Sequence, residues 1–149
     1  MNRDFFEKYK SPYISHCEED TVNLAKDIAD VLKAGDILAL KGDIGTGKTT
    51  FTKALAKSLG ISETVSSPTF TIVKEYRSGR IPLFHFDVYR LSNEDDFYDI
   101  GAEEYLYGDG VTVIEWAGVV LDALPKNTTI IDIQYGNYEG ERIFNFRVK

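Results

Sequence analysis

The segment GDIGTGKTT, residues 42–50, places three glycines within six residues and follows them with a lysine and two threonines. Glycines at this density cost backbone entropy, so their presence needs a reason. An apolar run, ILAL (residues 37–40), precedes the segment, and FTKALAKSL (residues 51–59) has the pattern of a helix. A strand, a glycine-rich turn and a helix in this order are typical of a phosphate-binding loop.

The segment satisfies the Walker A pattern GxxxxGK[ST], with Gly42, Gly47, Lys48 and Thr49 at the fixed positions. In this pattern, backbone N–H groups and the N-terminus of the following helix face a phosphate chain. The lysine reaches the β- and γ-phosphates, and the threonine hydroxyl ligates Mg²⁺. The alternative is a strand–helix turn without a ligand, which the motif and its context together disfavour. We expect the phosphate site to consist of Gly42, Gly45, Thr46, Gly47, Lys48, Thr49 and Thr50.

Two acidic residues end apolar runs elsewhere in the chain. Asp87 ends LFHFD and Glu115 ends VTVIE. Carboxylates at the C-terminal edge of an α/β sheet lie where ligands bind, although a single such residue is often only a turn or cap. Together with a Walker A loop, the pair favours a role in holding a metal ion and orienting water. His85 faces the same side of its strand as Asp87, so it either orients that carboxylate or packs on the sheet.

The bulk composition limits the class of protein. A chain of 149 residues with 43% hydrophobic and 28% charged residues is expected to form one domain, residues 1–149. The net charge of −7 disfavours a basic nucleic-acid-binding surface. Its single cysteine, the lack of an N-terminal apolar run and the lack of a membrane-length apolar segment predict a cytoplasmic protein that does not enter a membrane.

Hydrophobic patterning predicts a three-layer α/β domain of the P-loop NTPase kind with a mixed parallel and antiparallel sheet. Helices are expected at residues 21–33 and 48–59 and in pieces over 93–107. A hairpin is expected from strands at 69–76 and 81–89. Further strands are expected at residues 37–40, 111–115, 128–135 and 142–148. The first helix should bury Val22, Ala25, Ile28, Ala29 and Leu32 and be capped by Asp20 or Thr21.

Four segments in this order, GDIGTGKTTFTKAL, SSPTFTIVKEY, LFHFDVYRL and VIEWA, resemble the TsaE (YjeE) family. The resemblance runs from about residue 14 to Pro125. It implies a small bacterial ATPase that binds ATP and Mg²⁺ and acts in the synthesis of threonylcarbamoyladenosine in tRNA. The implied partners are TsaB and TsaD, which carry out the transfer beside the anticodon, so tRNA would be reached indirectly through the complex.

The resemblance also implies roles for individual residues. Residues 67–69 would form a switch-like loop that senses the γ-phosphate. Arg90 would either stabilise transition-state charge or, as we favour, be structural or face a partner. Glu18 and Thr21 would border the adenine. Lys48, Asp87 and Glu115 would form the catalytic set, and Thr49, Asp87 and Glu115 would bind the metal.

Two other functions remain open at this point. Many small-molecule kinases share the Walker A motif, but they need an acceptor pocket and an arginine-bearing lid, and mid-chain arginines are few. A nucleotide-gated interaction module would instead use residues 66–76 to select a partner. The NKxD motif of guanine recognition is absent from the sequence, which favours adenine or weak base discrimination.

Overall fold

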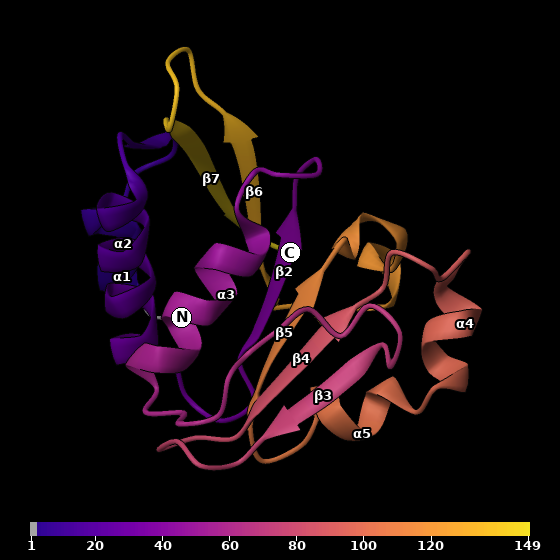
Figure 1. Cartoon of the computed structure of the whole chain (residues 1–149). Helices are drawn as coiled ribbons and strands as arrows, with labels where there is room; N and C mark the ends of the chain where they lie inside the picture. The colour runs from indigo at the N-terminus through magenta and orange to yellow at the C-terminus, as the bar shows by residue number, and fades with distance from the viewer. Residues whose placement is uncertain (1–2) are drawn as a thin grey trace.

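The computed structural model describes residues 3–149 (Figure 1). Seven strands form one sheet in the order β1-β7-β6-β2-β5-β4-β3. The four central strands, β6, β2, β5 and β4, are mutually parallel, while β3 and β7 pair antiparallel with their neighbours. The predicted mixed α/β sheet is therefore confirmed. The strands are β1 (Tyr13–Ser15), β2 (Ile37–Lys41), β3 (Val73–Tyr76), β4 (Leu83–Asp87), β5 (Val111–Glu115), β6 (Thr129–Tyr135) and β7 (Arg142–Val148).

Helices cover both faces of the sheet, which confirms the three layers. One core joins α1 (Arg3–Lys8), α2 (Glu18–Val31) and α3 (Lys48–Ser58) to the sheet, with Leu38 and Leu40 pointing into it. The other core joins α4 (Glu94–Asp99) and α5 (Ala102–Leu106) to the sheet, and it includes Ala39 of β2. Figure 1 shows the two groups of helices on opposite sides. Two short 3₁₀ turns, η1 (Ala117–Val119) and η2 (Leu121–Ala123), complete the second layer.

The predicted hairpin is present, but both of its strands are shorter than expected. Residues 69–71 form a turn, and β3 begins only at Val73. Ile72 has a left-handed backbone with φ of 70°, and its N–H donates to the carbonyl of Pro68 at 2.7 Å. This local bond competes with strand pairing, so the apolar pattern of residues 69–72 misled the prediction. The second strand spans Leu83–Asp87 rather than residues 81–89.

The first long helix differs from its prediction at both ends and on one face. It begins at Glu18 after Cys17 and ends at Val31, so Thr21 lies inside the helix and neither predicted cap residue is its cap. Val22, expected in the core, is 39% exposed, whereas Thr21 is 6% exposed. The buried stripe therefore begins one residue earlier than expected and continues through Leu24, Ala25, Ile28, Ala29 and Leu32.

Residues 3–15 contain two elements that the sequence did not indicate. The strand β1 pairs with β7 at the edge of the sheet, and α1 packs on α2. Tyr9 and Lys8 both donate hydrogen bonds to the carboxylate of Asp27 on α2. Residues 3–15 are therefore anchored both to α2 and to the C-terminal strand β7.

The parallel strands place the predicted acidic residues beside the glycine-rich loop. Strands β2, β4 and β5 run the same way, so their C-terminal ends meet at one edge of the sheet. Asp87 and Glu115 are register partners there, and Leu40, just before the loop, is the register partner of Glu115. Within the described residues, no helix has both the length and the apolar character needed to cross a membrane.

Candidate nucleotide-binding site

The loop between β2 and α3 has the backbone that its glycines predicted. Gly42, Gly45 and Gly47 have φ values of 143°, 81° and 101°, in the region that favours glycine. Gly47 immediately precedes Lys48, the first residue of α3, so the loop opens directly onto the N-terminus of that helix. This geometry leaves helix N–H groups facing the loop, as anion binding requires.

Lys48 lies folded along its own loop. Its Nζ donates to the carbonyls of Gly42 at 2.6 Å and Asp43 at 2.8 Å, and it stands 4.0 Å from the centroid of the Trp116 ring. Burial lowers the pKa of the ammonium, and nearby carboxylates, Glu115 first among them, oppose that change. The ammonium is thus bonded to two loop carbonyls, and an incoming anion would have to replace them as its acceptors.

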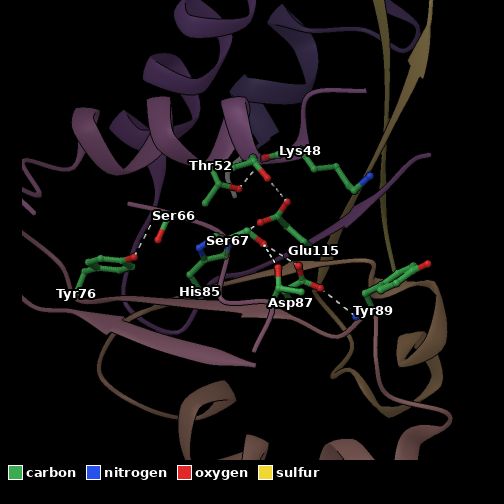
Figure 2. A network of polar contacts seen from close by, with 11 residues as sticks. Lys48, Thr52, Ser66, Ser67, Tyr76, His85, Asp87, Tyr89 and Glu115 are labelled. Atoms are coloured by element: carbon green, nitrogen blue, oxygen red, sulfur yellow. Dashed lines mark hydrogen bonds and ion pairs between the residues drawn. The ribbon is translucent and has the colours of Figure 1, made fainter. Parts of the chain in front are cut away.

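Glu115 is buried at the centre of the site and has both carboxylate oxygens occupied (Figure 2). Thr49 Oγ1 donates to its Oε1 at 2.9 Å, and His85 Nε2 bonds its Oε2. A carboxylate only accepts, so His85 Nε2 carries the proton of this bond. The other ring nitrogen, Nδ1, is buried and has no hydrogen-bond partner among the described residues. The hypothesis that His85 orients Asp87 is therefore wrong: the imidazole contacts Glu115.

Asp87 connects the sheet edge to the segment that precedes β3. Ser67 Oγ donates to its Oδ2 at 2.8 Å, and the N–H of Tyr89 donates to its Oδ1 at 3.0 Å. Ser67, the first of the predicted switch-like residues 67–69, is thereby held against Asp87. Arg90 is exposed and lies over the ring of Phe70, 4.7 Å from its centroid, away from the acidic pair's hydrogen bonds.

These groups surround one cleft of about 440 Å³. It brings together the second half of the loop, the acidic pair and the switch-like segment. Trp116 lies at this cleft with a left-handed backbone and contacts Tyr89 at 4.8 Å between ring centroids. The lining residues are Ile44, Gly45, Gly47, Lys48, Thr49, Thr50, Ser67, Thr69, Asp87, Tyr89, Glu115 and Trp116.

A smaller cavity of about 190 Å³ adjoins the loop on the side of α2. Glu18 and Thr21, expected near an adenine, both line it, and Gly47 and Thr50 line this cavity as well as the main cleft. The Thr21 hydroxyl is 2.7 Å from the Ser15 hydroxyl. The structure thus brings both predicted residues beside the loop, separate from the acidic pair.

Comparison with known proteins identifies the family. The family model described as "Threonylcarbamoyl adenosine biosynthesis protein TsaE" matches residues 15–144. The chain belongs to the TsaE family. A TsaE protein of Bacillus subtilis is 50% identical over 116 residues, covering 78% of this chain and 72% of the relative. A TsaE protein of Treponema pallidum is 44% identical over 121 residues, covering 81% of this chain and 89% of the relative.

A solved structure has a similar fold. The crystal structure of YdiB from Bacillus subtilis superposes with a TM-score of 0.78 at 41% sequence identity, covering 91% of this chain and 82% of that one. The match supports the fold of this chain.

The donor set of this TsaE chain suits Mg²⁺ bound together with phosphate. Mg²⁺ prefers oxygen ligands and is usually held by one or two carboxylates plus substrate phosphates. Thr49 and Glu115 already touch, and Asp87 is the register partner of Glu115. Within residues 3–149 no cluster of three or more His, Cys, Asp or Glu side chains forms an all-protein metal cage, so this set fits an ion that the phosphates help to hold.

Sequence reasoning missed two residues that contact the loop, Tyr135 and Arg142. The Tyr135 hydroxyl donates to the Ile44 carbonyl, and Arg142 donates to the carbonyls of Gly45 and Thr46. Both residues sit at ends of C-terminal strands whose pattern is otherwise generic. No local signal marks them, because the contact depends on β6 pairing beside β2.

Proposed function

We propose that this protein is a Mg²⁺-dependent ATPase that acts with TsaB and TsaD in the synthesis of threonylcarbamoyladenosine in tRNA. The observation that carries the proposal is the contact between Thr49 of the Walker A loop and the buried Glu115. The biosynthetic role is supported by membership of the TsaE family, whose description names that pathway. With a net charge of −7, the chain would reach tRNA through its partners, and its proposed location is the cytoplasm.

The loop and the start of α3 bind the triphosphate in this proposal. Lys48 leaves the carbonyls of Gly42 and Asp43 and turns its ammonium to the β- and γ-phosphates. Backbone N–H groups and the helix N-terminus stabilise the remaining negative charge. The adenine occupies the smaller cavity beside Glu18 and Thr21.

The acidic pair positions the metal and the attacking water. Thr49, Glu115 and Asp87 would hold Mg²⁺, which neutralises charge that develops on the phosphates. Glu115, kept in place by His85, orients the water for attack. Ser67 contacts Asp87, so residues 67–69 respond to changes at the metal and phosphate site and pass them to the surface around Phe70, which is exposed.

Phosphate release from Mg-ATP, with and without purified TsaB and TsaD, tests the proposal. The wild type should hydrolyse ATP and be stimulated by the partners, whereas Lys48→Ala should lose nucleotide affinity and all hydrolysis above background. Equal rates for the wild type and Lys48→Ala, with or without partners, would contradict an ATPase. Phosphate transfer to a metabolite in the same assay would instead support a small-molecule kinase.

A further inference from the structure

The outer side of the phosphate-binding loop is held by two side chains that the proposed chemistry does not use. Tyr135, the last residue of β6, donates its hydroxyl hydrogen to the carbonyl of Ile44 at 2.6 Å. Arg142, the first residue of β7, donates from Nε to the carbonyl of Thr46 at 3.0 Å and from Nη2 to that of Gly45 at 3.3 Å. Three successive loop carbonyls are therefore bound from the β6–β7 hairpin, which lies beside the loop in Figure 1.

The direction of these carbonyls sets the direction of the loop N–H groups. In a planar trans peptide the carbonyl of one residue and the N–H of the next point in opposite directions, and the loop peptides are trans. Carbonyls turned to the hairpin thus turn the N–H groups of Gly45 and Gly47 to the opposite side. Both glycines line the main cleft, and neither Tyr135 nor Arg142 lines it. Arg142 does line the smaller cavity beside Glu18 and Thr21.

The contacts between hairpin and loop are close enough to require glycine. A Cβ on Gly45 would lie 2.6 Å from the Tyr135 hydroxyl, and a Cβ on Gly42 would collide with the carbonyl of Ile133. These two glycines therefore serve the fit to β6 as well as the turn. The Arg142 guanidinium also lies over the Tyr135 ring, 4.8 Å from its centroid, so the two side chains support one another.

We propose that Tyr135 and Arg142 are positioning residues that hold the phosphate-binding loop in its binding shape before a nucleotide arrives. The inference rests on the proposed nucleotide site and assigns part of its affinity to the C-terminal hairpin. Lys48 must break its bonds to the loop carbonyls to reach a phosphate. The hairpin's bonds to the loop carbonyls lie outside the main cleft and need not break when phosphate binds. Less of the loop therefore has to be ordered on binding, and the affinity for the phosphate chain rises.

Calorimetric titration with ATP and with inorganic tripolyphosphate tests this proposal. Tyr135→Phe removes one donor without a charge change, and Arg142→Met removes the guanidinium. We expect Tyr135→Phe to weaken both ligands several-fold and Arg142→Met to weaken them about tenfold, the scale of a lost charge-assisted hydrogen bond. Arg142→Lys keeps the charge but cannot span two carbonyls, so it should restore only part of the loss. Arg147→Met, an exposed arginine on the same strand, is the matched control and should bind as the wild type does.

The outcomes separate this inference from the proposed function. Failure of the wild type to bind either ligand would overturn both. Wild-type binding that is unchanged in Tyr135→Phe and Arg142→Met would overturn the positioning role alone, as would full rescue by Arg142→Lys, because charge would then suffice. A loss for ATP but not for tripolyphosphate would show that Arg142 contacts the nucleoside instead. Thermal unfolding of each variant without ligand checks that the affinity is that of folded protein.

Discussion

At the scale of single residues, the site depends on a histidine whose partner the sequence could not specify. His85 is fully buried and bonds Glu115, while Glu115 also accepts from Thr49. The alternation of side chains along β4 placed His85 on the same face as Asp87, which suggested that pair. The neighbouring strand decides the outcome instead, because strand pairing brings Glu115 of β5 within reach. A pairing between strands is invisible to a pattern within one strand.

His85→Leu should therefore impair hydrolysis more than nucleotide binding. Without the imidazole, Glu115 loses one of its two hydrogen-bond donors and the orientation that they give it. We expect kcat for ATP hydrolysis to fall by about tenfold or more, while the affinity for ADP changes little. His85→Gln, whose side-chain amide can donate from a position near Nε2, should recover part of kcat. Steady-state hydrolysis and ADP titration measure the two effects, and equal losses in both would contradict a role confined to Glu115.

At the scale of elements, the sequence predicted best where pattern and local chemistry agree. The strand at residues 142–148 and the helix that starts at Lys48 match their predictions, since alternation and the glycine turn mark them locally. The segment before β3 does not match, because the left-handed Ile72 and its bond to Pro68 override an apolar run. The phosphate loop was predictable from its motif, whereas its support by Tyr135 and Arg142 arises only from tertiary packing.

The short helix α4 depends on its N-cap. Asn93 accepts a hydrogen bond from the N–H of Asp96 at 3.0 Å, and α4 places the buried Phe97 against Phe86 of β4. Asn93→Ala should lower the free energy of unfolding by about 1 kcal/mol, the usual effect of losing such a cap. Asn93→Asp keeps an acceptor at the helix N-terminus and should stay within about 0.5 kcal/mol of the wild type. Urea denaturation compares the three proteins, and a neutral Asn93→Ala would show that packing alone maintains α4.

At the scale of the whole molecule, residues 3–15 join distant parts of the fold. The strand β1 pairs with β7, and Tyr9 and Lys8 bond Asp27 on α2. These bonds hold the pKa of Asp27 below its ordinary value of 3.8, with the Lys8 bond the larger cause. Burial and the bond to Asp27 together raise the pKa of Tyr9 to about 12 from 10.0. Attachment of α1 therefore depends on an ionised aspartate and a neutral tyrosine.

The signs of these two shifts predict a stability window. A lowered carboxyl pKa contributes stability above pH 3.8, which is lost as the pH falls through the lower folded value. A raised tyrosine pKa contributes stability below pH 10.0, which is lost as the pH rises towards about 12. Asp27→Asn removes the charge that both contributions share. In urea denaturation at a series of pH values, the free energy of unfolding of the wild type should exceed that of Asp27→Asn by about 1 kcal/mol near pH 7. This difference should shrink at both extremes of pH.

The matched control is Asp30→Asn, which changes an exposed carboxylate on the same helix and should show no such window. A difference that is constant with pH would mean that α1 is held by apolar packing of Phe5 rather than by this cluster.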